Sequence, residues 1–534
     1  MRRWNAPIVL FNLAAWSLSF GLLATATRAA DGNYDSATNQ VPPERVQAAI
    51  QKLAELAEST LQSTGVPGIA IVVVDKDRVL SMQGFGVREA GKPARIDADT
   101  VFQVASMSKP ITSSVLAVLV GEEKIDWDDR VIDHDPGFRM YDPYVTRELR
   151  LRDLLCHRSG LPDHSGDLLE DLGFARAKIL HQLRYQPPDS SLRTQFAYTN
   201  FGYSEAAYAV CPEGKSWADL AEQTLFAPAG MNSTSYRFAD YERATNRAVL
   251  HVPIDGQNSL TKGPGKWTAR YTRQPDAQAP AGGVSTTPSD LSRWLRLQLD
   301  GGQLDGKPLI AADALAETHT PQIVTSFSPD QGRISSYGLG WIVGIDRGGT
   351  VAWKHSGAFA LGMRTEVALL PAQGIGIAVL SNAAPSGIPE GLIESFIDLV
   401  IEGELQRDWM EFANRMWDEQ TKAELAQQRD YSNPPASPSP PLALSAYTGK
   451  FENQFFGPIE FLERQGKLIM RQGPKPLEGE LVHWDRDVFI YQPVGEMSGG
   501  PAGVQFSINP AGKADQVVIE NLNIHGLGTF ARQE

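Results

Sequence analysis

The chain has 534 residues, of which 42% are hydrophobic and 21% charged, and its formal net charge is −14. This is the composition of a globular protein, and the length predicts more than one domain, because single hydrophobic cores rarely grow beyond about 250–300 residues. No basic run interrupts the acidic charge. Nucleic acid is therefore not expected as a partner, since binding phosphates requires clustered Lys and Arg.

The first 30 residues have the three parts of a secretory signal peptide. Arg2 and Arg3 precede an apolar stretch that ends at Leu23, and small residues follow up to Ala30. We therefore expect cleavage within the small residues and export to the periplasm or out of the cell. The alternative is an uncleaved anchor, because about 18 apolar residues approach the length that spans a bilayer. Apart from such an anchor, no stable membrane partner is expected.

A polar segment, residues 31–44, is expected to be the flexible N-terminus of the mature protein. From Glu44 to Thr64 apolar residues recur close to every 3.6 positions, which predicts an amphipathic helix. Apolar runs at 68–74 and 78–85, separated by a polar turn, predict a β-hairpin.

Further strands are expected only much later, after a stretch that alternates helices and loops. An interrupted helix over 387–428 follows them. Strands from the two ends must therefore pair around a helical middle, which predicts an α/β sandwich with an antiparallel sheet over residues 45–430. The later strands are expected at 337–345, 351–354, 365–370 and 375–380.

The C-terminal part of the chain predicts a second domain. Residues 431–442 contain five prolines and are expected to form an extended linker. Short apolar runs between Gly, Pro and Asn turns over 443–534 predict a small all-β domain, either a sandwich or a partial barrel. Its clearest strands are expected at 468–471, 481–483, 488–491, 504–508 and 516–520.

The sequence contains only two cysteines, Cys156 and Cys211. They could form a disulfide, but two small buried apolar side chains are the favoured interpretation. Two cysteines do not make a Cys-rich zinc site, and the nine histidines show no His-Glu-x-x-His spacing. Neither a metal nor another cofactor is expected.

Ser106 is the candidate nucleophile, because apolar, strand-like residues lead into it and an apolar helix follows. A helix N-terminus favours a developing anion, and a spacing of three places Lys109 on the same face one turn later. A lysine in a mostly buried cleft has a lowered pKa and could accept the Ser hydroxyl proton. The same Ser-x-x-Lys spacing recurs at Ser259 and Lys262, but in a polar loop with no helix to hold the two side chains together.

Two further short patterns carry groups suited to catalysis. In Tyr198-Thr199-Asn200 a phenol can transfer protons and an amide can donate to a substrate carbonyl. The segment His355-Ser356-Gly357-Ala358 ends an expected strand, where Gly permits close approach of the backbone to a ligand. Read alone, each pattern is more often an ordinary turn.

Taken together and in this order, the three patterns resemble the Ser-x-x-Lys, Tyr/Ser-x-Asn and Lys/His-Thr/Ser-Gly boxes of the serine β-lactamase, DD-peptidase and penicillin-binding family. The likeness is to the class C-like branch and covers about residues 45–400, and the C-terminal domain resembles an appended lipocalin-like domain. Further stretches that are similar to this branch lie at 66–68, 154–162, 226–234, 281–287 and 337–341.

The resemblance implies a role for each box residue. Ser106 would attack a carbonyl, Lys109 and Tyr198 would transfer protons, and Asn200 would orient the substrate. The backbone N–H groups of Ser106 and Ala358 would bind the oxyanion. Which of Lys109 and Tyr198 is the base stays open.

The third box departs from the classical pattern, because His355 occupies the position where β-lactamases carry Lys. With an ordinary pKa near 6.5, His is mostly neutral at pH 7 and binds a substrate carboxylate less well. Lys354 is a poor substitute, since adjacent strand residues point to opposite faces. A histidine here is similar to the D-aminopeptidase and family VIII esterase branches.

We therefore expect a small-molecule or peptide substrate, with an ester, an amide or a D-amino-acid peptide favoured over a β-lactam. The alternatives are a β-lactamase and a non-catalytic peptidoglycan or ligand sensor on the same fold. An α/β-hydrolase is disfavoured, because the chain has no G-x-S-x-G elbow. Substrate choice is expected to depend on the loops near 160–190 and 240–280.

Overall fold

The computed structural model describes residues 41–254, 264–328, 333–345, 349–384, 386–427, 429–431 and 433–533. The expected signal segment, the first part of the polar segment up to residue 40 and the second Ser-x-x-Lys copy at Ser259 lie outside these ranges. Within them, no helix has both the length and the apolar character needed to cross a membrane.

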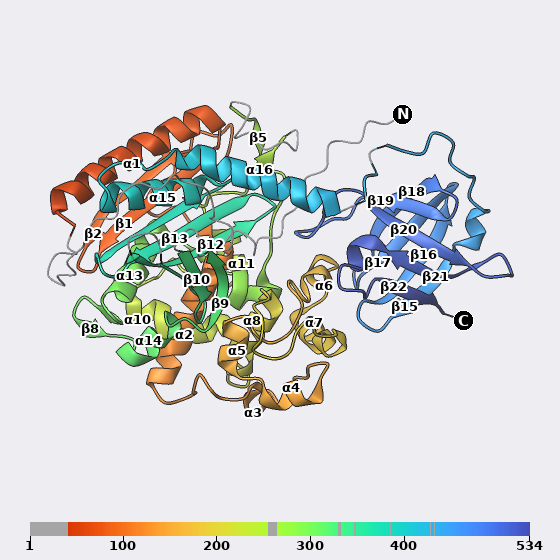
Figure 1. Cartoon of the computed structure of the whole chain (residues 1–534), viewed down its shortest axis with the longest axis horizontal. Coiled ribbons are helices and arrows are strands. Elements are labelled where there is room, and N and C mark those ends of the chain that lie inside the picture. Colours follow the sequence, from red (N-terminus) through yellow and green to blue (C-terminus); the bar gives the residue numbers. More distant parts are fainter. Residues whose placement is uncertain are drawn as a thin grey trace.

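The larger domain is built on one antiparallel sheet of eight strands, in the order β2-β1-β14-β13-β12-β11-β10-β9 (Figure 1). The first and last strands of the domain in chain order are neighbours near one edge of this sheet, where Ile69 of β1 pairs with Ser381 of β14. The predicted antiparallel α/β sandwich is confirmed. The strands are β1 (Gly68–Asp75), β2 (Val79–Gly86), β9 (Ile323–Ser328), β10 (Arg333–Tyr337), β11 (Ile342–Ile345), β12 (Val351–Phe359), β13 (Met363–Leu370) and β14 (Ile375–Ser381).

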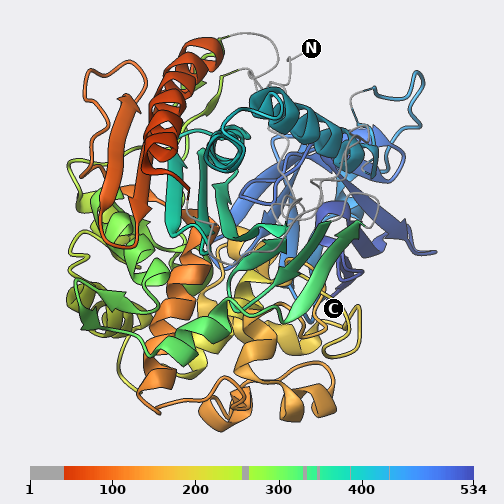
Figure 2. The same ribbon diagram turned by 60° about the vertical axis from the view of Figure 1, so that its left-hand side comes forward.

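Helices cover both faces of the sheet (Figure 2). On one face α1 (Pro43–Thr64) packs against α15 (Ile388–Ile401), and α16 (Trp409–Gln427) packs on α15. Alternate side chains of β1 enter the two cores, with Ile71 on the α1 side and Val72 on the side of α2 (Ser108–Gly121) and α13 (Pro288–Leu299). Because both faces are covered, the strand is apolar at nearly every position.

Between β2 and β9 the chain forms a mainly helical region, which lies on the α2 side of the sheet (Figure 1). Its other helices are α3 (Val131–His134), α4 (Pro143–Glu148), α5 (Leu151–Leu155), α6 (Asp167–Asp171), α7 (Arg176–Gln182), α8 (Asn200–Ala209), α9 (Trp217–Ala221), α10 (Ala227–Ala229), α11 (Phe238–Arg243), α12 (Ala279–Gly282) and α14 (Ala312–Thr318). Short strand pairs join parts of it, namely β3 (Phe102–Gln103) with β6 (Ser285–Thr286), β4 (Val252–Pro253) with β5 (Trp267–Thr268), and β7 (Gln303–Leu304) with β8 (Lys307–Pro308).

The C-terminal domain is a closed antiparallel barrel of eight strands, as a lipocalin-like domain would be. All five expected strands are present, and three unexpected ones complete the barrel where β15 pairs with β22, so the sandwich alternative is wrong. Aromatic side chains fill its interior, with Phe506 in contact with Phe451, Phe461 and Phe489. The strands are β15 (Gly449–Asn453), β16 (Gly457–Arg464), β17 (Lys467–Gln472), β18 (Leu477–Asp485), β19 (Val488–Tyr491), β20 (Ala502–Ile508), β21 (Ala514–Ile519) and β22 (Thr529–Arg532).

Several expected boundaries are wrong. The strand expected over 337–345 is two strands, because the chain turns at Gly340, whose φ is +87°. The interruption expected in the helix over 387–428 is present, because the segment forms two helices, α15 and α16. The first helix begins at Pro43, inside the segment expected to be flexible, because Pro is compatible with the first helical position.

The two cysteines do not form a disulfide, so that alternative is wrong. Cys156 is buried, and burial raises the pKa of its thiol to about 12. The proline-rich segment contacts the barrel, because the N–H of Ser439 donates to the Asp485 carboxylate at 2.7 Å.

Candidate active site

Ser106 lies in a tight 3₁₀ turn, η2 (Ala105–Met107), directly before α2 rather than in the α-helix itself. Ala105 is fully buried in the left-handed region at φ +47°, a conformation that costs energy in a residue other than Gly. Neighbouring hydroxyls hold the turn: Ser108 Oγ donates to Ala105 O at 2.6 Å, and Thr365 Oγ1 of β13 donates to Val104 O at 2.9 Å. The turn therefore presents Ser106 in one fixed direction.

Lys109 is completely buried next to Ser106. Its Nζ lies 3.2 Å from Ser106 Oγ, 2.7 Å from Asn200 Oδ1 and 3.1 Å from Ala281 O. Burial lowers the pKa of the Lys109 amine well below its ordinary value, and the charge of Asp167 opposes this only in part. The one-turn spacing thus brings an amine with a reduced proton affinity against the candidate nucleophile.

Tyr198 completes this group from the loop before α8. The Lys109 Nζ lies 4.4 Å from the centre of the Tyr198 ring. Burial raises the pKa of the Tyr198 phenol, while its hydrogen bond with the Ser106 side chain opposes that change. His157 lies beneath the ring at 4.4 Å between centres, and its Nδ1 accepts the N–H of Thr199 at 3.1 Å, which fixes the backbone of the Tyr-x-Asn segment.

Asn200, the first residue of α8, connects Lys109 to a carboxylate that the sequence did not single out. Its Nδ2 donates to Asp167 Oδ2 at 2.8 Å, and His164 Nδ1 donates to the same oxygen at 2.7 Å. Burial alone would lower the pKa of His164, but Asp163 and Asp167 raise it to about 9, so the ring is a cation paired with Asp167. The i, i+3 spacing of His164 and Asp167 was the available signal, but it is too common to be specific.

His355 faces this group from β12. Its Nε2 lies 2.8 Å from the hydroxyl of Tyr337, and its Nδ1 lies 2.6 Å from Ser356 O. Burial lowers the pKa of His355, and the nearby Lys109 lowers it further, to about 3, so the ring is neutral. The carbonyl oxygen of Ser356 can only accept a hydrogen bond, so the Nδ1 of the neutral ring carries the proton. Nε2 is then the acceptor, and the Tyr337 hydroxyl donates to it.

Lys354 points away from the site, as strand alternation predicts. Its Nζ pairs with Glu394 of α15 at 2.5 Å on the opposite face of the sheet. Lys354 therefore does not supply the cation that His355 lacks.

Gly357 allows β12 to approach the Ser106 turn very closely. A Cβ at this position would lie 2.1 Å from Val104 O and 3.0 Å from the backbone nitrogen of Met107. The pairing of β11 with β12 stops at Lys354, so among the described residues no strand pairs with Ser356, Gly357 and Ala358 on the side of β12 away from β13. The structure thus brings Ser106, Lys109, Tyr198 and Asn200 together with the segment of β12 that carries His355, Gly357 and Ala358. The expectation for the Ser356 side chain is wrong, because its Oγ donates to Glu366 Oε1 at 3.4 Å on the face of the sheet that Lys354 occupies.

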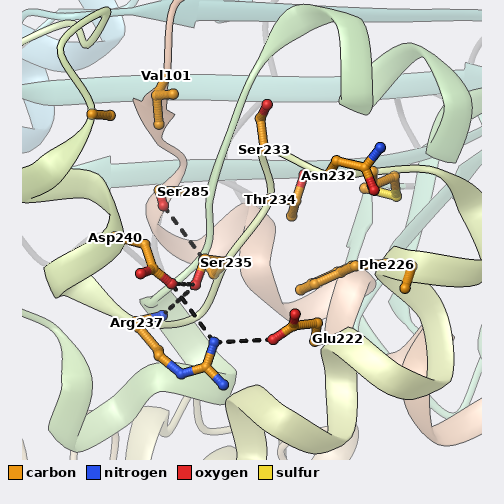
Figure 3. Close-up of a pocket in the computed structure, with 13 residues that line it drawn as sticks. Val101, Glu222, Phe226, Asn232, Ser233, Thr234, Ser235, Arg237, Asp240 and Ser285 are labelled. Atoms are coloured by element: carbon orange, nitrogen blue, oxygen red, sulfur yellow. Dashed lines mark hydrogen bonds and ion pairs between the residues drawn. The ribbon is translucent and has the colours of Figure 1, made fainter.

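A separate cavity of about 500 Å³ lies elsewhere in the helical region (Figure 3). None of the expected site residues lines it. The charged groups in its wall are paired with one another, with Arg237 3.1 Å from Glu222. Among the residues that the structure describes, no group of three or more His, Cys, Asp or Glu side chains is placed to hold a metal ion.

Comparison with known proteins agrees with this geometry. Residues 47–394 match the family model described as Beta-lactamase. Residues 433–528 match the model of a domain of unknown function, DUF3471, so the barrel has relatives of its own.

Among curated proteins, the chain is 24% identical over 505 residues to "Unguisins hydrolase ungD'" of Aspergillus campestris, covering 88% of this chain and 89% of that protein. It is 27% identical over 322 residues to "Penicillin-binding protein 4" of Amycolatopsis lactamdurans, covering 59% and 81%. The solved structure of the octameric penicillin-binding protein homologue from Pyrococcus abyssi superposes with a TM-score of 0.57 at 16% identity, covering 90% of this chain and all of that one. At this identity the superposition shows a shared fold.

Proposed function

This chain belongs to the β-lactamase family of serine hydrolases, and on that premise we propose that it cleaves an ester, an amide or a D-amino-acid peptide through an acyl-enzyme on Ser106. The observation that carries the proposal is the contact of the buried Lys109 Nζ with Ser106 Oγ at 3.2 Å. An amine with a lowered pKa at this distance can accept the hydroxyl proton as the oxygen attacks.

Acylation would form a bond between Ser106 Oγ and the substrate carbonyl carbon. The proton of Ser106 passes to Lys109, whose pKa is lowered, rather than to a Tyr198 phenolate, because burial raises the pKa of the phenol. Tyr198, next to both groups, can then deliver its proton to the leaving group as the bond to the carbonyl carbon breaks, and it regains a proton from the protonated Lys109, which returns to the neutral amine. Water would release the acyl group by the same steps in reverse.

The oxyanion would be held by the backbone N–H groups of Ser106 and Ala358. Two features support this role: the fixed 3₁₀ turn at Ser106 and the open edge of β12 beyond Lys354, brought close by Gly357. Both donors would belong to rigid backbone, so they would not need to reorganise when charge develops.

The neutral His355 favours an ester, amide or D-amino-acid peptide over a β-lactam. A β-lactam carries a carboxylate, and a ring with a pKa of about 3 offers it no cation at pH 7. Asn200 would contact the substrate carbonyl only secondarily, because both ends of its amide already bind Lys109 and Asp167.

A substrate panel with a covalent probe tests the proposal. Short-chain p-nitrophenyl esters, D-amino-acid amides, D-Ala-D-Ala peptides and nitrocefin would be compared for the wild type and Ser106→Ala, and fluorophosphonate labelling would be read by intact mass. We expect turnover of an ester or amide and one added phosphonyl group, both lost in Ser106→Ala. Absence of labelling and of turnover in the wild type would instead favour a non-catalytic sensor, and fast nitrocefin turnover a β-lactamase.

A further inference from the structure

The C-terminal barrel touches the larger domain at the edge of the candidate active site. The N–H groups of Glu496 and Met497, in the loop between β19 and β20, donate to the Asp171 carboxylate at 2.9 and 2.7 Å. Asp171 is the last residue of α6, the helix that begins with Asp167. One barrel loop is therefore joined to the helix that orients Asn200 and Lys109.

Two glycines of the barrel make this contact possible. A Cβ on Gly495 would lie 2.3 Å from the Cγ of Asp171, and a Cβ on Gly473 would lie 2.2 Å from Leu172 O. Both have positive φ angles, +110° and +80°, which other residues adopt only at a cost. The barrel thus has small residues at both points where its loops meet the end of α6.

The Glu496 side chain reaches the strand that carries the expected oxyanion donor. Its carboxylate accepts the N–H of Ala360 at 2.8 Å, two residues after Ala358 and directly after the end of β12. Beyond Lys354 this strand has β13 as a neighbour but not β11. Glu496 therefore anchors the end of β12, in the part of this strand that pairs with β13 but no longer with β11.

Arg273 fixes Glu496 in this position. The Nε of Arg273 lies 3.3 Å from Glu496 Oε1, its Nη2 lies 2.6 Å from Glu170 Oε2, and its guanidinium lies 5.3 Å from the centre of the Phe359 ring. The side chains of Arg273 and Glu170 are 8% exposed and that of Glu496 12%. The two loops expected to control substrate choice, near 160–190 and 240–280, thus meet the barrel in one buried ionic cluster.

We propose that Glu496 is a positioning residue of this hydrolase, through which the C-terminal barrel holds the end of β12 against the Ser106 turn. The inference rests on the proposed function, because it assigns to Ala358 the oxyanion role. The barrel then contributes to catalysis by fixing the position of the strand that carries Ala358. A displacement of about 1 Å at a catalytic donor can cost on the order of 100-fold in rate, so a single fixed N–H at Ala360 is sufficient to matter.

The charges around Glu496 support a dependence on pH. Arg273 faces three carboxylates, those of Glu170, Asp171 and Glu496, and Asp167 lies beyond Glu170. Burial, opposed by Arg273, raises the pKa of Glu496 to about 7, and burial, opposed chiefly by the backbone N–H of Met497, raises that of Asp171 to about 8. The two carboxyl groups therefore bind more protons when the barrel loop contacts the larger domain than when it is displaced from it. The free energy of this contact accordingly becomes less favourable as pH rises from about 5 to about 8.

Full-length variants test the proposal by kinetics and by amide exchange. Glu496→Ala removes the acceptor of Ala360 N–H, Glu496→Gln keeps an acceptor but not the charge, and Glu463→Ala on the exposed face of β16 is the matched control. Gly495→Ala is a second, independent way to displace the loop. The readouts are kcat and KM on the best ester of the panel, the rate of fluorophosphonate labelling, and hydrogen exchange of residues 355–362.

We expect Glu496→Ala and Gly495→Ala to lower kcat and the labelling rate about tenfold or more, with a smaller change in KM and faster exchange over 355–362. Glu463→Ala should match the wild type. Glu496→Gln should keep most activity at pH 6, and its kcat relative to the wild type should rise towards pH 8.5, because the amide does not ionise. A merely structural contact would not produce this pH-dependent ratio.

The inference is overturned if the wild type is active and Glu496→Ala matches it in kcat, labelling and exchange. If the wild type shows neither turnover nor Ser106-dependent labelling, the proposed function fails instead. Exchange over 355–362 then decides separately whether Glu496 holds β12, and unchanged exchange in Glu496→Ala would reject that contact.

Discussion

Asn200 binds Lys109 with the oxygen of its amide, at 2.7 Å, and Asp167 with the nitrogen, at 2.8 Å. An ionised carboxylate accepts hydrogen bonds but donates none, so Asp167 determines which end of the amide faces Lys109. His164 donates to the same Asp167 oxygen and holds the carboxylate in place. The environment of the candidate base is thus controlled by a residue that contacts neither Lys109 nor Ser106 by a hydrogen bond.

Asp167→Asn should lower kcat about tenfold or more. The change removes the negative charge that pairs with His164 and introduces an NH2 donor, so the orientation of the Asn200 amide is no longer fixed; hydrogen bonds to charged groups contribute about 1.5–3 kcal/mol. Stopped-flow acylation with a p-nitrophenyl ester measures the effect. Asp163→Asn is the matched control, because Asp163 is 35% exposed and lies farther from His164, at 3.8 Å. Equal losses in the two variants would contradict a specific role for Asp167.

Gly357→Ala should abolish most activity and labelling and destabilise the protein by about 1–3 kcal/mol. The added methyl group would overlap with Val104 O, 2.1 Å away, and push β12 from the Ser106 turn. Gly344→Ala on β11 is the control, since nothing lies within 4 Å of its Cβ position. Kinetics and urea denaturation of both variants test this, and a fully active Gly357→Ala would reject the close-approach argument.

His355 should reduce stability as pH falls below about 6.5. Its folded-state pKa of about 3 means that the unfolded chain binds a proton that the folded state does not, so stability is lost as pH falls, by up to about 1.4 kcal/mol per pH unit. His355→Gln should flatten this dependence in denaturation curves between pH 6.5 and 4.

His319 provides the comparison for this effect. Burial lowers its pKa to about 3 as well, and its ring stacks on Trp353 at 3.7 Å. His319→Gln should flatten the stability curve in the same way without changing the pH–rate profile. If neither variant changes the slope, the two rings are not buried in neutral form.

Glu390→Ala should cost about 3–5 kcal/mol of unfolding free energy, because it removes one half of a buried ion pair with the Arg364 guanidinium. The Nε of Arg364 on β13 lies 2.6 Å from Glu390 Oε1 at the start of α15, and both side chains are 2% exposed. Glu55→Ala, which breaks an exposed pair with Lys52, should cost at most about 1 kcal/mol. Chemical denaturation of the two variants distinguishes these cases.

Features that depend on local pattern could be predicted. The apolar run of β1 indicated a strand buried on both faces, and a spacing of three with a following helix brought Lys109 to Ser106. The ends of strands were harder to predict, because Gly340 turns the chain and separates β10 from β11 where the apolar pattern continues. In the barrel, the missed strands are β15, β16 and β22, and β15 and β22 close it by pairing the two ends of the domain.

The sequence by itself determined the antiparallel sandwich, the second domain and the three boxes that converge at Ser106, because periodicity and short spacings report burial and local geometry. Only the tertiary structure decided that His164 and Asp167 orient Asn200, and that Glu496 of the barrel binds Ala360 beside the site. The contacts of Asn200 with Asp167 and of Glu496 with Ala360 join residues far apart in the chain. A hydrogen bond between them depends on how the loops and domains pack, which no local pattern encodes.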